Sequence, residues 1–279
     1  MRYRGRFAPS PTGPLHMGSL VTAVASYIDA RANQGEWLVR IEDLDPPREK
    51  IGAAEHILSD LAIHGLHWDG EVFFQSKRLK TYESALSYLI KENAVFKCNC
   101  LRKQLSEDGT CTSECSSRQH SLDEEFSFRL NNTRASFKID DFILGEQIWN
   151  KQELSKDFVV KRRDGLFSYQ LAVVVDDASQ KITHIIRGSD LLDSTPKQQE
   201  VGSALNYSEI KYGHIPTITD VRGKKLSKQS LAPSIDRNRA VENLKQALEL
   251  LGQRQPHNLL KTPNEILGSA IEFWDRRAI

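Results

Sequence analysis

Residues 6–20 read RFAPSPTGPLHMGSL, a stretch in which turn-forming residues separate a short apolar segment from a helix-like run. Residues 5–10 (GRFAPS) predict a short strand, and the prolines and glycines that follow predict a tight turn. After Gly18, apolar residues recur at the spacing of one helix face, and Gly35 is expected to end that helix. A strand, a turn and a helix in this order are typical of the first unit of an α/β fold.

The mouth of this helix carries a histidine, His16, and a glycine, Gly18. A helix amino terminus presents unpaired N–H groups and a partial positive charge, and both favour phosphate. Gly18 lets a ligand approach the backbone closely, and His16 can donate to a phosphate oxygen. The stretch therefore indicates a phosphate site, and an ordinary Pro/Gly loop with a surface histidine is the alternative interpretation.

Strand-like and helix-like patterns alternate on both sides of a segment that has neither. This alternation predicts right-handed parallel units and an open α/β sheet. The pattern breaks from about 97 to 157, so we expect one nucleotide-binding domain split by an insertion, followed by a helical end from 236 onwards. The other expected elements are a strand at 36–45, helices near 49–65 and 80–93, a strand at 182–188, a helix at 195–206 and a strand at 215–218.

Composition says more about the cellular location of the protein than about its chemistry. The chain has 279 residues, and its 38 Lys and Arg balance 37 Asp and Glu, so bulk charge does not indicate nucleic acid, although a local basic face would suffice. No run of about 18 apolar residues exists to span a membrane. The amino terminus lacks the apolar core of a secretory signal, so we expect a cytoplasmic protein without a membrane partner.

All four cysteines, Cys98, Cys100, Cys111 and Cys115, lie within the predicted insertion. In a reducing cytoplasm, clustered cysteines favour a metal over disulfides. Four thiolates satisfy tetrahedral Zn²⁺ completely, which predicts one structural zinc ion per chain. Ordinary buried thiols are the alternative, and His120 is a possible substitute ligand.

Four segments together resemble a known family. HMGS (16–19) is similar to the HIGH signature of class I aminoacyl-tRNA synthetases, and KKLSKQ (224–229) is similar to their KMSKS signature. RIEDLD (40–45) and HIIRGSDLLDSTPKQ (184–198) resemble the glutamyl members of that class. The resemblance implies a Rossmann-like parallel sheet with a zinc-containing insertion and a short helical C-terminal part. The domains expected from it are two halves of a catalytic core (1–96 and 158–220), an acceptor-binding insertion (97–157), and the KMSKS-like loop with C-terminal helices (221–279).

The resemblance implies that ATP, as its Mg²⁺ complex, condenses with glutamate to an aminoacyl-adenylate. Catalysis in this class is mostly positioning and neutralisation of phosphate charge. His16 and Lys228 match the catalytic positions, with a solvated basic turn as the alternative for the lysine-rich loop. Ser19 replaces the second histidine of the signature, and Leu226 and Gln229 also depart from the pattern. The implied ATP-binding residues are Pro9, His16, Gly18, Ser19, Lys225 and Lys228.

The glutamate site also follows from charge. A substrate with two carboxylates needs cations, and Arg6 and Arg187 stand at the carboxyl edges of predicted strands, where an arginine fork binds carboxylate bidentately. Glu42 and Tyr169 match the family positions that hold the α-amino group. A surface ion pair for Arg187 and a core aromatic for Tyr169 are the alternatives. The expected glutamate-binding residues are Arg6, Ala8, Ser10, Glu42, Tyr169 and Arg187, whereas Asp43 and Asp45 are expected to be structural or helix-capping.

Only 51 residues follow Lys228 (279 − 228), fewer than a helical anticodon-binding domain needs. In this the chain resembles the glutamyl-queuosine tRNA(Asp) synthetase family, which implies tRNA-independent activation of glutamate and its transfer to queuosine at the wobble position. The expected partner is the anticodon stem-loop of tRNA(Asp), bound by a monomer. A truncated glutamyl-tRNA synthetase that charges a 3′ end and a non-catalytic RNA-binding relic are the alternatives. The residues suggested for RNA phosphate contacts are Lys161, Arg162, Arg163, Lys197 and Arg222.

Overall fold

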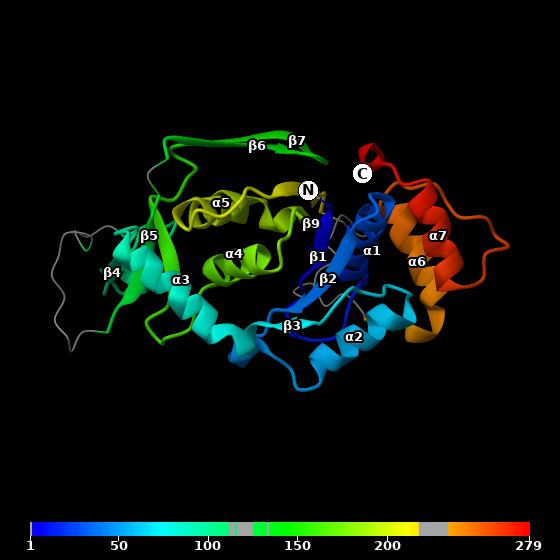
Figure 1. The fold of residues 1–279 in the computed structure, drawn as a ribbon, viewed down its shortest axis with the longest axis horizontal. Helices are drawn as coiled ribbons and strands as arrows, with labels where there is room; N and C mark the ends of the chain where they lie inside the picture. Colours follow the sequence, from blue (N-terminus) through cyan, green and yellow to red (C-terminus); the bar gives the residue numbers. More distant parts are fainter. Residues whose placement is uncertain (1, 112–114, 116–124, 133, 218–233) are drawn as a thin grey trace.

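A parallel sheet forms the centre of the molecule (Figure 1). The computed structural model describes residues 2–111, 115, 125–132, 134–217 and 234–279. β1 (Arg4–Phe7) pairs in parallel with β2 (Glu36–Ile41), and β2 pairs in parallel with the short β3 (Phe73–Phe74). These strands carry buried side chains on both faces, as parallel strands covered by helices require.

A second parallel pair continues this sheet. β9 (His184–Gly188) pairs with β10 (Lys211–Ile215). The backbone N–H of Thr183 donates to the carbonyl oxygen of Arg4 at 2.9 Å, which brings β9 alongside β1. The strands therefore lie in the order β3, β2, β1, β9, β10, which is the doubly wound arrangement of a Rossmann-like sheet.

Helices cover the sheet, and α6 and α7 form one end of the molecule (Figure 1). No helix in the described part of the chain combines the length and apolarity needed to cross a bilayer. The helices are α1 (Met17–Ala32), α2 (Ala53–Ile63), α3 (Leu79–Lys91), α4 (Tyr169–Ser179), α5 (Thr195–Ala204), α6 (Ala240–Leu250) and α7 (Pro263–Glu272).

The helix predicted after the opening turn is α1, and its end differs in detail from the expectation. The left-handed residue beyond the helix is Gln34, with φ 52°, and not Gly35. Gly35 is required for a different reason, because a Cβ there would lie 2.6 Å from the carbonyl oxygen of Tyr3. The glycine thus permits close packing of the turn against the start of β1.

An antiparallel sheet and a hairpin make up the segment in which the periodicity breaks. β4 (Val95–Cys98), β5 (Ser127–Asn131) and β8 (Asp157–Lys161) form the sheet. β6 (Ser136–Asp141) and β7 (Gly145–Asn150) form the hairpin, which runs beside α5 back toward the parallel sheet (Figure 1). Since β4 begins before residue 97 and β8 continues past 157, the sheet extends beyond both expected limits of the insertion, and the domain boundaries stay a prediction.

The last strand of the sheet was expected at 215–218, and this was wrong. β10 ends at Ile215, and Pro216 follows it with no N–H to continue the pairing. The strand instead begins at Lys211, in the sequence KYGHI, whose glycine and histidine hide the alternation typical of strands. Buried Tyr212 and His214 show that this polar-looking strand lies inside the protein.

The C-terminal helices α6 and α7 pack against α1 at one end of the molecule (Figure 1). Asp29 of α1 is fully buried and anchors the residues after α7. Its Oδ1 accepts from Trp274 Nε1 at 2.8 Å and from Arg276 Nε at 2.5 Å. The described part of the tail therefore buttresses the first helix of the core.

Candidate active site

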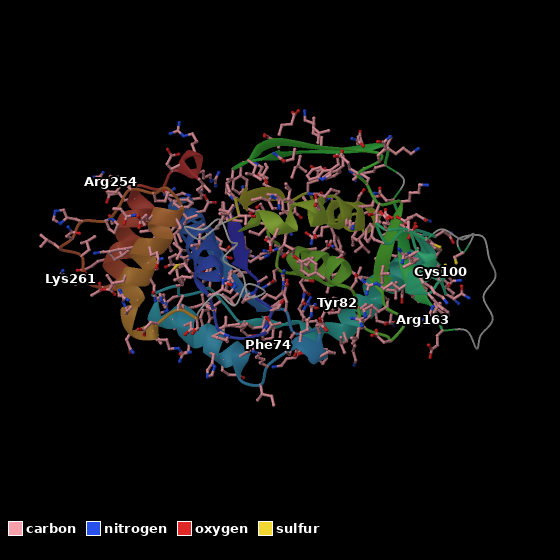
Figure 2. The ribbon with its side chains drawn as sticks, turned by 180° about the vertical axis from the view of Figure 1, so that it is seen from behind. Phe74, Tyr82, Cys100, Arg163, Arg254 and Lys261 are labelled. Carbon is pink, nitrogen blue, oxygen red and sulfur yellow. The ribbon has the colours of Figure 1, made fainter. Side chains whose placement is uncertain are left out.

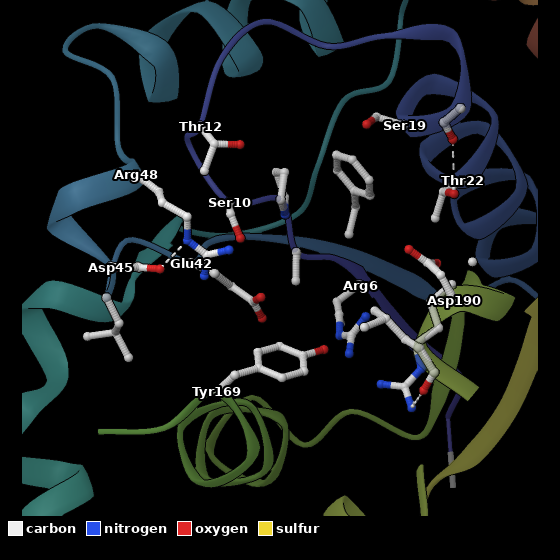
Figure 3. Close-up of a pocket in the computed structure, with 18 of the residues that line it drawn as sticks. Arg6, Ser10, Thr12, Ser19, Thr22, Glu42, Asp45, Arg48, Tyr169 and Asp190 are labelled. Atoms are coloured by element: carbon white, nitrogen blue, oxygen red, sulfur yellow. Dashed lines mark hydrogen bonds and ion pairs between the residues drawn. The ribbon is translucent and has the colours of Figure 1, made fainter. Parts of the chain in front are cut away.

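A cavity of about 880 Å³ opens at the carboxyl edge of the parallel sheet (Figure 3). Its walls are formed by the residues at the ends of β1, β2, β9 and β10 and by the amino-terminal ends of α1 and α4. The direction of strand order reverses between β1 and β9, and open α/β sheets bind ligands at that position. The topology alone thus places the ligand site here.

The structure brings together every described residue that the sequence assigned to ATP or glutamate. The expected residues that line the cavity are Arg6, Ala8, Pro9, Ser10, His16, Gly18, Ser19, Glu42, Tyr169 and Arg187. Lys225 and Lys228, with the rest of the KKLSKQ stretch, lie outside the described residues. Their roles stay predictions.

His16 is the N-cap residue of α1. Its Nδ1 accepts a hydrogen bond from the backbone N–H of Ser19 at 3.2 Å, and its backbone is extended, as an N-cap residue requires. The Ser19 hydroxyl lies 3.0 Å from Nε2 of the same ring. The pair stands at the amino terminus of α1 and lines the cavity, so it provides polar groups at the positive end of a helix dipole.

The described residues on either side of 218–233 lie at or near this cavity. Pro216 and Thr217 line it from one side. On the other side Ser234 forms an antiparallel bridge with His16, and the N–H of Ile235 donates to the carbonyl of Leu15 at 3.1 Å. The described residues that follow the KKLSKQ stretch in the chain thus lie beside the HMGS stretch, and those that precede it line the same cavity.

A buried ion-pair network supports the floor of the cavity. Asp177 of α4 lies with its Oδ1 3.2 Å from Nε of Arg6 and 2.8 Å from Nη1 of Arg40. Burial lowers the pKa of Arg6, but the carboxylate of Asp177 outweighs this effect, and the net pKa is raised. Burial likewise opposes ionisation of Asp177, yet Arg40 and Arg6 lower its pKa. All three groups therefore stay charged inside the protein.

Glu42 and Tyr169 present an acidic and a hydroxyl group to the same cavity (Figure 3). Burial raises the pKa of Glu42, and Arg40 and Arg6 offset this only in part. Burial also raises the pKa of Tyr169, and the charge of Glu42 raises it further. A poorly solvated carboxylate beside a protonated phenol favours a cationic ligand group, because the contact that Glu42 makes with Arg40 at 3.4 Å offsets its burial only in part.

Arg187 is held on several sides by protein acceptors. Its Nη1 donates to Gln198 Oε1 at 2.7 Å, and its Nη2 donates to Thr195 Oγ1 at 2.7 Å and to the Leu191 carbonyl at 3.2 Å. Its Nε donates to His214 Nε2 at 2.9 Å. Within the described residues, four of its five N–H groups are thus oriented by the protein.

Sequence reasoning missed the partners of Arg187. Gln198 and Thr195 lie in the quoted stretch 184–198. The sequence pattern of α5, however, does not indicate which of its side chains face β9. His214 lies on the strand that was expected further along the chain. Asp190 was also missed: it lines the cavity, and its Oδ1 would lie 2.5 Å from a Cβ on Gly188, which explains that glycine.

The four cysteines form the metal-binding candidate among the described residues. The Sγ atoms lie within 4.8 Å of one another, with separations of 3.7 Å for Cys98–Cys111 and Cys100–Cys111 and 3.5 Å for Cys100–Cys115. Tetrahedral zinc with Zn–S bonds near 2.3 Å needs sulfurs about 3.8 Å apart. Burial raises the pKa of Cys98 and of Cys115, so a cation is needed to hold these groups as thiolates.

Neighbouring side chains brace this cluster. Arg163 Nη2 donates to the carbonyl oxygens of Asn99 at 2.6 Å and of Cys100 at 3.4 Å, and Figure 2 shows it beside Cys100 at the same end of the molecule. The N–H of Cys111 lies 3.2 Å from Oδ2 of Asp157. The donor set, its spacing and its bracing fit a closed structural zinc site. His120 lies outside the described residues.

The suggested phosphate-contact residues divide by location. Arg162 lines the cavity and pairs with Asp164 at 2.5 Å, whereas Lys161 pairs with Glu83 at 2.9 Å. Arg163 braces the cysteine cluster, as described above, and Lys197 is half-buried on α5. Arg222 lies outside the described residues.

The two aspartates after β2 differ in role. Asp43 accepts from the N–H of Ser76 at 2.9 Å and from its hydroxyl at 2.6 Å, which ties the loop after β2 to the residues after β3. This is the structural role expected of it. Asp45 pairs with Arg48 and also lines the cavity, but no capping hydrogen bond from its side chain is formed (Figure 3).

A family model for tRNA synthetases class I (E and Q), catalytic domain, matches residues 2–250. The chain belongs to this class I synthetase family. Its α/β fold with a parallel sheet is therefore confirmed as that of a class I catalytic domain.

Curated relatives of this class I synthetase are similar over nearly their whole length. The glutamyl-Q tRNA(Asp) synthetase of Acinetobacter baylyi is 44% identical over 272 residues, which cover 98% of this chain and 92% of that protein. The glutamyl-Q tRNA(Asp) synthetase of Neisseria gonorrhoeae is 44% identical over 284 residues, which cover 98% of this chain and 96% of that protein.

Solved structures show the same architecture. One is a glutamate tRNA ligase from Elizabethkingia meningosepticum in complex with its amino acid, with a TM-score of 0.73 and 27% identity. The match covers 82% of this chain and 52% of that ligase. A glutamate-tRNA synthetase from Elizabethkingia anophelis has a TM-score of 0.81, 23% identity and full coverage of this chain, and it shows the fold alone.

Proposed function

We propose that this chain activates L-glutamate with ATP, without tRNA, and transfers the glutamyl group to queuosine at the wobble position of tRNA(Asp). The observation that carries this proposal is the cavity in which two arginines, a buried carboxylate and a phenol meet the HMGS cap of α1. The relatives named glutamyl-Q tRNA(Asp) synthetase, at 44% identity over 98% of the chain, support it. We place this reaction in the cytoplasm.

Activation requires a carboxylate oxygen of glutamate to attack the α-phosphorus of ATP, with pyrophosphate as the leaving group. Negative charge develops on the phosphate oxygens, so positioning and charge neutralisation lower the barrier. We assign the ATP side of the cavity to Pro9, His16, Gly18 and Ser19, which present the amino terminus of α1. Lys225 and Lys228 are proposed to supply cations to the phosphates of the Mg²⁺ complex of ATP.

Recognition of glutamate follows from the charged side chains on the side of the cavity opposite the ATP-binding residues. We assign the substrate carboxylates to Arg6 and Arg187, whose guanidinium groups are buried and face acceptors with fixed geometry. Glu42 and Tyr169 would hold the α-ammonium group, because their surroundings favour a cation. Ala8 and Ser10 line the wall between the two sets.

In the second half-reaction a hydroxyl of the queuosine base attacks the glutamyl carbonyl, an ester forms and AMP leaves. The anticodon stem-loop would approach the mouth of the cavity, where Arg162 lies, and the protein would act as a monomer. The four cysteines would hold one structural Zn²⁺, which stabilises the segment from 98 to 115 and takes no part in glutamyl transfer.

One specific observation favours a second candidate, the charging of a tRNA 3′ end. The glutamate tRNA ligase of Elizabethkingia meningosepticum shares 82% of this chain at 27% identity, so the same core occurs in an enzyme of that name. A non-catalytic relic is disfavoured, because a decayed site has no need of charged groups with matched partners around a cavity.

The test is glutamate-dependent exchange of pyrophosphate into ATP in the absence of tRNA, with aspartate and glutamine as control amino acids. Exchange with glutamate alone is expected. Labelled glutamate is then supplied with tRNA(Asp) that contains or lacks queuosine, and the RNA is cut into anticodon and acceptor fragments.

Label in the anticodon fragment, dependent on queuosine, supports the proposal. Label on the 3′-terminal adenosine would instead establish the second candidate. The absence of glutamate-dependent exchange from a folded protein would overturn both enzymatic assignments.

A further inference from the structure

The guanidinium of Arg187 is oriented from behind by a histidine on the neighbouring strand. His214 of β10 is fully buried, and its Nε2 accepts the Nε–H of Arg187 at 2.9 Å. β9 and β10 pair in register, with Arg187 directly opposite His214. The cavity-lining arginine and the buried histidine are therefore neighbours on the strands themselves.

The histidine can accept from Arg187 only in one tautomer. Its Nδ1 lies 2.5 Å from Oδ2 of Asp141, whose side chain is also fully buried. A carboxylate accepts hydrogen bonds, so the ring proton sits on Nδ1 and the lone pair on Nε2 faces Arg187. Burial lowers the pKa of His214, which keeps the ring neutral. Burial opposes ionisation of Asp141, but the hydrogen bonds from the His214 ring and from nearby backbone N–H groups together outweigh it and lower the pKa of Asp141.

Asp141 does not belong to the parallel sheet but to the end of the hairpin strand β6. Its Oδ1 also accepts from the N–H groups of Ile143 at 3.0 Å and Leu144 at 2.8 Å, which fixes the hairpin turn. The same turn is anchored to β10, since the N–H of Phe142 donates to the Tyr212 carbonyl at 3.0 Å. One carboxylate thus joins the hairpin turn to the ring that orients Arg187.

A close approach between the hairpin and β10 makes this junction rigid. The ring of Phe142 lies over Gly213, where a Cβ would be only 2.3 Å from the ring. Any larger residue at that position would push the hairpin off the strand that carries His214. The backbone contacts and the buried pair therefore hold the hairpin, the histidine and the arginine in one arrangement.

We propose that Asp141 and His214 are positioning residues that set the rotamer of Arg187 through the Nδ1-protonated tautomer, so that the insertion hairpin helps to form the carboxylate-binding end of the cavity. This inference rests on the proposed function only in the identity of the ligand as an amino acid carboxylate. The hydrogen-bond relay itself is independent of that assignment.

Two substitutions at one position separate the two contacts of the ring. In His214→Asn the amide nitrogen takes the place of Nδ1 and keeps the contact to Asp141, but the shorter side chain offers no acceptor to the Nε–H of Arg187. In His214→Gln the amide oxygen reaches the place of Nε2 and keeps an acceptor for Arg187. Asp141→Asn retains an oxygen for the turn N–H groups, while its NH₂ group forces the ring into the other tautomer, which places a donor against Arg187.

The relay is tested first by NMR on the full chain, which needs no activity. In the wild type, histidine ¹⁵N shifts should report a protonated Nδ1 for His214, and the Arg187 Nε–H should exchange slowly. Asn at 214 and Asn at 141 should speed this exchange, whereas Gln at 214 should preserve it. Unprotonated Nδ1 in the wild type, or unchanged exchange in all three variants, would overturn the inference whether or not the protein activates glutamate.

The second measurement is the Michaelis constant of each substrate in pyrophosphate exchange. His214→Asn and Asp141→Asn should raise the KM for glutamate at least about tenfold, the value of one hydrogen bond to a charged group, and leave that for ATP within about twofold. His214→Gln should raise the KM for glutamate less than His214→Asn does. If both constants and the melting temperature change together in all three variants, the pair is merely structural and the inference fails.

Discussion

Asp177 on α4 lies against Arg6 on β1, with Oδ1 3.2 Å from Nε and Oδ2 3.4 Å from Nη2. The same carboxylate pairs with Arg40 on β2, so it contacts two buried cations that are far from it in the sequence, and Glu42 and Asp176 lie near Arg40 as further anions. This contact joins the helix after the insertion to the first two strands of the core. It also fixes the position of the Arg6 guanidinium, which lines the cavity.

Removing this charge should therefore destabilise the fold. In Asp177→Asn Arg6 loses the carboxylate that it pairs with, and Arg40 keeps only longer contacts to Glu42 at 3.4 Å and Asp176 at 3.8 Å within the described residues. Breaking one buried pair costs about 3–5 kcal/mol of the free energy of unfolding. Urea unfolding monitored by circular dichroism measures it. Asp164→Asn breaks an exposed pair with Arg162 and is the matched control, with no measurable change expected. Equal stability of the two variants would contradict the role of Asp177.

Glu42 offers a test of substrate recognition, with the melting temperature measured alongside because its Oε1 also lies 3.4 Å from Nη2 of buried Arg40. Glu42→Gln keeps the shape of the side chain and removes the charge proposed for the α-ammonium group. The KM for glutamate should rise about 10- to 100-fold, the range for a lost hydrogen bond to a charged group, while the KM for ATP stays constant. Glu55→Gln, on the exposed face of α2, is the control and should match the wild type in both constants. A rise in the ATP constant alone would exclude Glu42 from the amino acid site.

Cys111→Ser should abolish metal binding. Cys111 lies 3.7 Å from two other sulfurs, and a hydroxyl is a poor replacement for one thiolate of four. Mass spectrometry of the purified metal content should show about one zinc ion per wild-type chain and almost none in the variant, with a lower melting temperature. Lys103→Ala, exposed on the same segment, should keep both the metal and the stability. Equal zinc in Cys111→Ser and the wild type would rule out the four-thiolate site.

His184 predicts a pH dependence of stability. Its ring stacks on Tyr3 at 4.1 Å, and burial, with Arg276 and Lys211, lowers its pKa from 6.5 to about 4. Between pH 4 and 6.5 the unfolded chain therefore binds more protons than the folded one. The stabilisation is complete above pH 6.5 and is lost as the pH falls toward 4.

From pH 7 to pH 5 this loss should be about 1 kcal/mol, after allowance for the partial exposure of the ring. His184→Gln removes the titrating group, so its stability should fall less over that interval, as measured by urea titrations at each pH. Parallel curves for the variant and the wild type would show that His184 does not contribute.

The tail after α7 provides a matched pair of arginines. Arg276 donates twice to buried Asp29, whereas Arg277 is 89% exposed and, within the described part of the chain, pairs with Asp275. Arg276→Ala should lower the free energy of unfolding by about 1.5–3 kcal/mol through lost hydrogen bonds to a charged group. It should also speed amide exchange in the residues after α7. Arg277→Ala should change neither quantity, and identical behaviour of the two variants would mean that Asp29 does not anchor the tail.

The sequence alone determined the local units and the chemical inventory of the site. Alternation of strand and helix patterns predicted the α/β fold, and the turn chemistry of residues 6–20 predicted a helix amino terminus at a ligand site, because these signals depend on neighbours within a few residues. The spacing of the cysteines predicted their cluster for the same reason. Charge at strand ends singled out Arg6 and Arg187, the family resemblance added Glu42, and all three line the cavity.

Only the tertiary structure decided which distant groups meet. Asp177 and Arg6 are 171 residues apart, and Asp141 and His214 are 73 apart, so neither pairing leaves a local pattern. The strand that carries His214 has a polar sequence and is nevertheless buried, because partners on other elements satisfy its polar groups. Gly213 and Gly35 likewise look like turn residues, although each is required because another segment packs against it. Side chains within a few residues define elements, but long-range packing selects the partners that make a site.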